Sequence, residues 1–146
     1  MTGDVGTLLA REAIRELLAE YCFRLDAHEL RALGALFEAD GRWISRNGEA
    51  TGPEGIAAFL GRLVPPPGPG TRRKHLTTNV VIALKGTVAR VTSNFLVVRD
   101  TDAGPVIAVA GTYRDVVAAA GDRWLFRRRE LFHDIAGESG LSAPSA

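Results

Sequence analysis

Four segments of similar length in the second half of the chain constrain its fold most strongly. They span residues 72–84, 87–100, 106–117 and 122–134, and each shows the side-chain alternation that is typical of a β-strand. The connections between them contain two to five residues, which is short enough for antiparallel hairpins. Because helical patterns precede these segments, the sequence predicts an α+β domain with helices on one face of a curved, mostly antiparallel sheet.

The clearest helical pattern runs from Thr7 to Leu25. Its apolar residues recur at three- and four-residue steps, and charged residues fill the other faces. The apolar positions are Ile14, Leu17, Leu18, Tyr21 and Leu25. Tyr21 lies at the centre of this stripe and Asp26 at its margin. A slight unwinding of the helix end is therefore expected to bring the Asp26 carboxylate into the same cavity as the Tyr21 phenol.

Two shorter helices and a brief strand are expected before the four long strands. Asp26 and Glu29 have the spacing of a capping box, which predicts a second helix with Asp26 as its N-cap. Residues 38–41 are expected to form a turn, followed by a brief strand at residues 42–45. Residues 51–54 then begin a third helix, because proline is favoured in the first helical turn.

The size and composition of the chain are typical of one compact domain. Its 146 residues, 46% of them hydrophobic, can bury a full core, which we expect to span residues 7–135. The proline-rich stretch 65–70 is expected to be an exposed loop, and residues 136–146 a loosely ordered tail. A net charge of +1 excludes a general attraction to nucleic acids or to anionic membranes.

Cysteine usage and the N-terminus favour a cytoplasmic location. The single cysteine, Cys22, cannot form an internal disulfide, and the first residues lack the pattern of a signal peptide. No apolar run is long enough to span a bilayer. Only Lys74 and Lys85 among the basic residues are lysine, a bias toward arginine that suggests a GC-rich bacterial genome. We therefore expect a soluble bacterial protein of the cytoplasm.

Polar residues on the strands are the candidates for a functional site. In the first long strand, alternation places His75, Thr77 and Asn79 on one face. The polar positions of the other strands that could reach the same pocket are Asn94, Tyr113, Asp115, Arg129 and His133. One sequence does not determine the register of a sheet, so either face could line the pocket.

Several short motifs follow one another in an order that is typical of one superfamily. They are Tyr21 with Asp26, residues 36–41, residues 52–56, His75 with Asn79, residues 111–115, and Trp124 with Arg129. Over residues 8–136, these motifs resemble the SnoaL-like branch of the nuclear transport factor 2-like, or cone-fold, superfamily. The resemblance implies a conical sheet with three N-terminal helices on its concave side, and a homodimer formed through the sheet.

Scytalone dehydratase and bile-acid dehydratase are the members of this superfamily whose polar residues are most similar to those of this chain. The similarity implies that His75 is the general acid or base, that Asp26 orients it, and that Tyr21 polarises a substrate oxygen. It also implies substrate contacts from Trp43, Phe59, Asn79, Asn94, Tyr113, Arg129 and His133. A second acid or histidine on a strand of those enzymes has no clear counterpart here, and Asn94 and Asp100 are the nearest candidates.

Two classes of function are compatible with these residues. The first is a cofactor-independent lyase or isomerase that acts on a small hydrophobic, oxygenated molecule, with no metal or organic cofactor. The second is a non-catalytic small-molecule-binding or assembly module, in which Tyr21 belongs to the core, Asp26 only caps a helix and His75 is an ordinary strand residue. Water addition to an epoxide would need an Asp-Arg-Asp arrangement, which the sequence does not display.

The basic run at residues 127–129 does not indicate nucleic-acid binding. Alternation along a strand sends the middle arginine to the opposite face, and aromatic residues for base stacking are lacking at strand spacing. We expect instead that one of these arginines is buried in an ion pair across the sheet, with Glu130 or Asp115.

Overall fold

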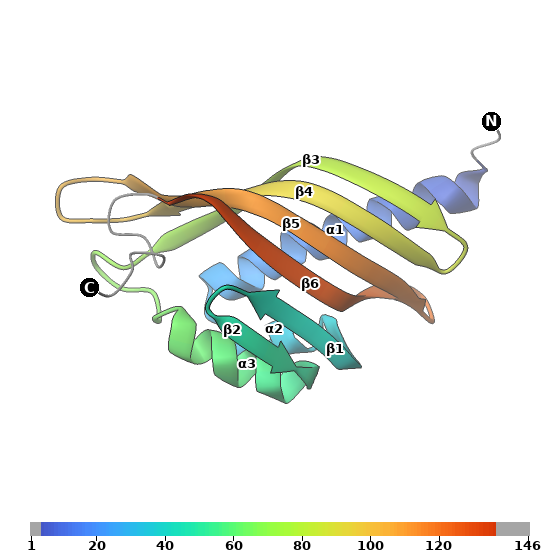
Figure 1. Ribbon diagram of the computed structural model, residues 1–146, viewed down its shortest axis with the longest axis horizontal. Helices are drawn as coiled ribbons and strands as arrows, with labels where there is room; N and C mark the ends of the chain where they lie inside the picture. Colours follow the sequence, from blue (N-terminus) through green and yellow to red (C-terminus); the bar gives the residue numbers. More distant parts are fainter. Residues whose placement is uncertain (1–3, 137–146) are drawn as a thin grey trace.

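Residues 4–136 are described by a computed structural model, in which three helices pack against one curved six-stranded sheet (Figure 1). The elements are α1 (Val5–Asp26), α2 (Leu30–Gly34), β1 (Phe37–Ser45), β2 (Gly48–Thr51), α3 (Gly52–Leu63), β3 (Arg73–Lys85), β4 (Val88–Arg99), β5 (Val106–Ala120) and β6 (Arg123–Ala136). The predicted α+β class is confirmed. The tail predicted for residues 136–146 lies outside the described residues, except for Ala136.

The six strands follow the order β2-β1-β6-β5-β4-β3. β3 to β6 form the predicted antiparallel meander, whereas β1 pairs with β6 in parallel, which makes the sheet mixed. β2 was not predicted. The turn predicted at residues 38–41 is wrong, because these residues belong to β1, where they form the irregular stretch between Phe37 and Arg42. A locally irregular strand with exposed polar residues has the same sequence signature as a turn.

α1 is the longest helix, and it lies along the edge strand β3 (Figure 1). Its first turn is capped by Asp4, whose carboxylate accepts a hydrogen bond of 2.7 Å from the backbone nitrogen of Thr7. The whole predicted apolar stripe is buried. This burial fixes the rotation of α1, and with it the direction of the side chains at the C-terminal end.

The junction between α1 and α2 differs from its prediction. Asp26 is the last residue of α1 and does not cap α2, whose N-cap position is held by Glu29 without a side-chain hydrogen bond. The chain turns at His28, which has a φ of 58°. Its Nε2 lies 3.0 Å from the carbonyl oxygen of Val64, at the end of α3. Asp26 is therefore free to point toward β3.

A bulge in β3 decides which of its side chains face the helices. Asn79 has a φ of 56°, and the register with β4 shifts between Thr78 and Val81. His75 and Thr77 lie opposite the buried residues of β4, whereas Val81 is exposed. The prediction that His75, Thr77 and Asn79 share one face is therefore wrong for Asn79, because the bulge reverses the alternation of the side chains.

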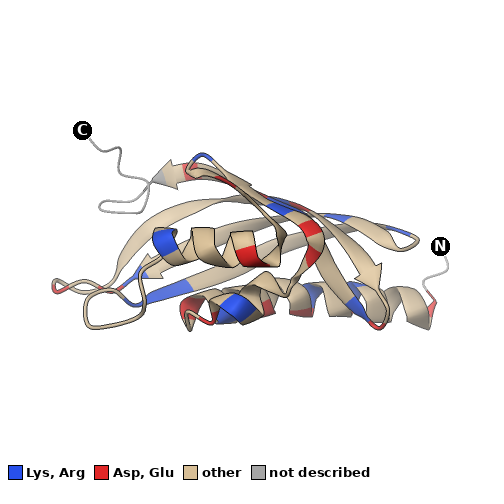
Figure 2. Cartoon of the chain, turned by 90° about the horizontal axis from the view of Figure 1, so that it is seen from below, with Lys and Arg blue, Asp and Glu red and all other residues tan. Residues whose placement is uncertain are grey.

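Acidic and basic residues are interspersed over the helices and strands, as Figure 2 shows for the view from below. Among the helices within residues 4–136, none is both long enough and apolar enough to cross a membrane.

Candidate functional site

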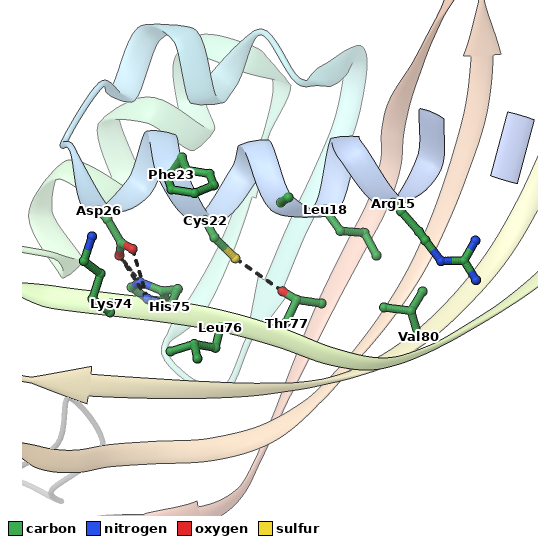
Figure 3. A pocket seen from close by; sticks show the side chains of 11 residues that line it. Arg15, Leu18, Cys22, Phe23, Asp26, Lys74, His75, Leu76, Thr77 and Val80 are labelled. Atoms are coloured by element: carbon green, nitrogen blue, oxygen red, sulfur yellow. Dashed lines mark hydrogen bonds and ion pairs between the residues drawn. The ribbon is translucent and has the colours of Figure 1, made fainter. Parts of the chain in front are cut away.

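Asp26 and His75 meet where the end of α1 lies against β3 (Figure 3). One carboxylate oxygen of Asp26 lies 2.6 Å from Nδ1 of His75, and the other accepts a hydrogen bond of 3.0 Å from the backbone nitrogen of His75. The two side chains are almost buried, with exposed fractions of 7% for His75 and 11% for Asp26. An ionised carboxylate can only accept, so Nδ1 carries the proton and Nε2 is the nitrogen left for chemistry.

The position of β3 explains why this pair forms. β3 is an edge strand, so the outward backbone nitrogen of His75 has no neighbouring strand to pair with. The carboxylate of Asp26 accepts the hydrogen bond that a neighbouring strand would otherwise accept. The Asp26 side chain therefore accepts from the backbone nitrogen of His75 and also orients the His75 ring.

His75 also lines a cavity between the helices and the concave face of the sheet. The cavity has a volume of about 30 Å³, which accommodates a group about the size of a water molecule. Its lining residues are Tyr21, Leu25, Trp43, Asn47, Leu60, Leu63, Val64, His75, Phe95, Val97, Val109, Tyr113, Leu131 and His133. Most of these are apolar, and Asp26 is not among them. The ring of His75 therefore separates Asp26 from the cavity.

Tyr21 and Trp43 form a buried hydrogen bond in the cavity wall. Nε1 of Trp43 donates to the hydroxyl oxygen of Tyr21 over 2.9 Å. Burial raises the pKa of Tyr21 to about 12, although the nearby Arg129 charge and the hydrogen bond from Trp43 act in the opposite direction. Tyr21 is therefore a neutral phenol at physiological pH. Because its oxygen already accepts from Trp43, its own hydrogen can be donated to another acceptor.

A fully buried ion pair lies beneath this wall. Arg129 makes two hydrogen bonds to Asp115, of 2.9 and 2.8 Å, and neither side chain is exposed. The guanidinium carbon lies 3.7 Å from the ring centre of Tyr113 and 4.2 Å from that of Tyr21. The predicted ion pair with Asp115 is confirmed. Arg129 is fully buried and does not line the cavity, so the structure gives no support to its predicted contact with a substrate.

His133 lies on the opposite side of the cavity from His75. It pairs in register with Gly111 on β5, whereas His75 pairs with Val97 on β4. Its Nδ1 is buried and has no hydrogen-bond partner among the described residues. Burial lowers the pKa of His133, and the charge of Arg46 adds to this effect, while Asp134 opposes it. The ring is therefore held in its neutral form.

With this geometry in place, the chain can be compared with known proteins. The SnoaL-like domain matches residues 6–130. The chain belongs to the SnoaL-like domain family. None of the curated proteins matches the sequence.

Solved structures show the same fold. Rv3472 from Mycobacterium tuberculosis, a protein of unknown function, is 24% identical with a TM-score of 0.81, over 92% of this chain and 77% of that one. A candidate scytalone dehydratase from Novosphingobium aromaticivorans is 25% identical with a TM-score of 0.72, over 94% and 97%. ActVI-ORFA from Streptomyces coelicolor is 21% identical with a TM-score of 0.76, over 85% and 96%. A further neighbour from Novosphingobium aromaticivorans, 22% identical with a TM-score of 0.75 over 92% of each chain, is described as NTF2-like with a cystatin-like fold.

This SnoaL-like domain brings only part of the predicted site together. Trp43 and Tyr113 line the cavity, and Phe59 packs behind Trp43 with ring centres 5.4 Å apart. Asn79 and Asn94 are exposed and do not line the cavity. The bulge turns Asn79 outward, and Asn94 alternates with the inward-facing Phe95.

Some cavity residues of the SnoaL-like domain were not predicted. Asn47 reaches the cavity from the turn between β1 and β2, and Leu60, Leu63 and Val64 reach it from the end of α3. The Asn47-Gly48 pair signals a hairpin turn, but the position of that turn over the sheet follows only from the tertiary fold. Within residues 4–136, no three His, Cys, Asp or Glu side chains come together as a metal site.

Proposed function

We propose that this protein is a cofactor-independent lyase or isomerase that moves a proton on a small hydrophobic, oxygenated substrate. The observation that carries the proposal is the Asp26–His75 pair, which leaves Nε2 of His75 available beside a cavity that Tyr21 also lines. The likeness to a candidate scytalone dehydratase supports the same class of reaction.

In the proposed reaction, Nε2 of His75 takes a proton from a carbon next to the substrate carbonyl. Asp26 stabilises the imidazolium that forms, because its carboxylate already accepts from Nδ1. Tyr21 donates to the carbonyl oxygen, and this bond strengthens as the enolate develops. The same proton then passes from Nε2 to a leaving hydroxyl, which departs as water, or to another carbon, which gives an isomer.

His133 is proposed to contact the polar end of the substrate that lies farthest from His75. Its buried Nδ1 is unpaired among the described residues, and a neutral ring can accept a hydrogen bond there. The remaining wall, including Trp43 and Tyr113, would pack against the apolar part of the substrate.

The small volume of the cavity implies that one wall moves when a substrate binds. A volume of about 30 Å³ is far below the several hundred Å³ that small-molecule sites usually have. Leu63 and Val64 lie in this wall at the end of α3, and the loop at residues 65–70 follows them. We propose that these residues move outward to admit the substrate.

The test is a panel of cyclic and aromatic β-hydroxy ketones. Water loss would be followed by the absorbance of the conjugated product, and proton abstraction by deuterium uptake from D2O next to the carbonyl. A substrate that reacts with the natural protein should react about 100-fold more slowly with His75→Gln, because glutamine cannot transfer the proton. Arg90→Gln, at an exposed position of β4, is the control and should keep its rate. An unchanged rate in His75→Gln contradicts the proposal.

The alternative is a small-molecule-binding or assembly module without catalysis. This alternative requires no proton transfer by His75, and the cavity of about 30 Å³ is as small for a bound ligand as for a substrate. It predicts binding from the same panel with no deuterium uptake. Water addition to an epoxide has less support, because Asp115 and Arg129 are sealed below the cavity.

We also propose that two copies pair through the outer face of the sheet. Ile107, Phe132 and Ile135 project from that face, with exposed fractions of 56%, 36% and 64%. Exposed apolar side chains that gather on one face are typical of an interface between subunits.

A further inference from the structure

A larger groove follows the seam between α1 and β3 and passes the Asp26–His75 pair (Figure 3). It consists of two adjoining hollows of about 600 and 530 Å³, which share Phe23, Asp26 and Lys74. Each volume is in the range of small-molecule sites. From Arg15 to Asp26 the helix side of the groove is about 16 Å long, given a rise of about 1.5 Å per residue.

The body of the groove is apolar. Leu18 and Cys22 line it from α1, and Leu76 and Val80 line it from β3. Phe23 is 70% exposed at the junction of the two hollows. A phenylalanine left in water beside an apolar groove indicates a surface that binds another apolar group.

The end of the groove near the start of β3 is basic. Arg73 lies directly opposite Arg99 in the register of β3 and β4, and Lys74 follows Arg73 in the wall. Burial lowers the pKa of Arg73, and the charge of Arg99 lowers it further. The Nε of Arg73 is buried and has no hydrogen-bond partner among the described residues. An anion at this end would offset the positive charge that Arg73 and Lys74 bring to the wall.

Two carboxylates, Asp26 and Asp100, line this end beside three cations, Arg72, Arg73 and Lys74, which leaves one positive charge in excess. Asp100 is paired with Arg72 at 3.3 Å, and both oxygens of Asp26 accept hydrogen bonds from His75. No acidic partner is recorded for Arg73 or Lys74 within residues 4–136. The groove therefore combines a long apolar body with a positive charge at one end.

We propose that the seam between α1 and β3 binds a small amphiphile, with its apolar body along Leu18, Cys22 and Val80 and a carboxylate or phosphate group at Arg73 and Lys74. This site is separate from the cavity that Tyr21 lines, although His75 contributes to the walls of both. The proposal does not depend on catalysis there.

The test uses NMR amide shifts of the ¹⁵N-labelled full chain with three probes that share one apolar tail: octanoate, octyl phosphate and octanol. Both anions should perturb residues 15–26 and 73–80. Octanol should bind about tenfold more weakly or worse, because it cannot form the charge-assisted hydrogen bonds. The stronger of the two anions identifies whether the head group is a carboxylate or a phosphate.

Matched variants distinguish octanoate binding in the groove from a general effect of the protein's charge. Arg73→Gln should weaken octanoate binding about tenfold, whereas Arg90→Gln, an exposed arginine on the outer face of the sheet, should leave it unchanged. Phe23→Ser, at an exposed position that should tolerate the change, is expected to weaken octanoate and octanol alike. Each variant is first checked for a folded spectrum.

Three results would overturn the proposal. These are octanol binding as tightly as octanoate, equal losses in Arg73→Gln and Arg90→Gln, and seam shifts that depend on protein concentration alone, which would mean that a second copy covers the seam. Tyr21→Phe keeps this question apart from catalysis, because Tyr21 lines the cavity and neither hollow of the groove. A variant that loses activity but still binds octanoate bears only on the reaction at the cavity.

Discussion

The carboxylate of Asp26 holds His75 by two separate hydrogen bonds, one to its ring and one to its backbone. The backbone bond attaches the end of α1 to an edge strand, and the ring bond assigns the proton to Nδ1. Structure and chemistry at this site therefore depend on the same side chain.

Removing the Asp26 carboxylate should lower stability as well as any activity. Asp26→Ala leaves the backbone nitrogen and Nδ1 of His75 without an acceptor in an almost buried setting, at a cost of about 1–3 kcal/mol. Asp26→Asn keeps one acceptor oxygen and should cost less. Urea unfolding of the two variants measures the difference. Equal stability of Asp26→Ala and the natural protein would contradict this account.

Tyr21 and Trp43 should be energetically coupled, because they share a buried hydrogen bond. Tyr21→Phe leaves Nε1 of Trp43 unpaired in the core, at a cost of about 1–3 kcal/mol. Trp43→Phe removes the donor. The double variant should lose less stability than the two single losses combined, by about 0.5 kcal/mol or more. Strictly additive losses in urea unfolding would show that the bond contributes nothing.

His133 should make the protein less stable in mild acid. Because burial lowers the pKa of its folded-state ring below 6.5, the unfolded chain takes up this proton first as the pH falls. The free energy of unfolding should therefore decrease below about pH 6.5, and the decrease should be shallower in His133→Gln. Thermal melts of both proteins from about pH 7.5 to pH 5 measure the two slopes. A slope in His133→Gln that equals that of the natural protein would contradict this prediction.

The outer face of the sheet should control the oligomeric state. Phe132→Asp places a charge among exposed apolar residues and should convert a dimer into a monomer. Ala58→Asp, on the exposed surface of α3, is the control and should remain dimeric. Light scattering on a sizing column gives the masses. A natural protein with the mass of one chain would rule out the proposed pairing.

Much of the fold could be predicted from periodicity. α1 and β3 to β6 are long and strongly patterned, so their local preferences agree with their final environment. β2 and the first part of β1 were missed. They are short or irregular, and they become strands through pairing with β6 and with each other rather than through local preference.

The site was harder to predict than the fold. The roles suggested for Asp26 and His75 came from resemblance, and only the tertiary structure brings the two side chains within 2.6 Å. Asn79 was misplaced because a single bulge residue reverses the alternation that follows it. From its local sequence, Asp26 was expected to cap α2. Its carboxylate instead bonds to His75, which lies 49 residues away in the chain.

The proton position on His75 is the most direct test of the central claim, and it requires no substrate. Nitrogen-15 NMR of the imidazole rings distinguishes the two tautomers of a neutral histidine. The account predicts that neutral His75 carries its proton on Nδ1, with Nε2 unprotonated toward the cavity, because the Asp26 carboxylate can only accept. A neutral His75 protonated on Nε2 would contradict the assignment of Asp26 as its orienting partner.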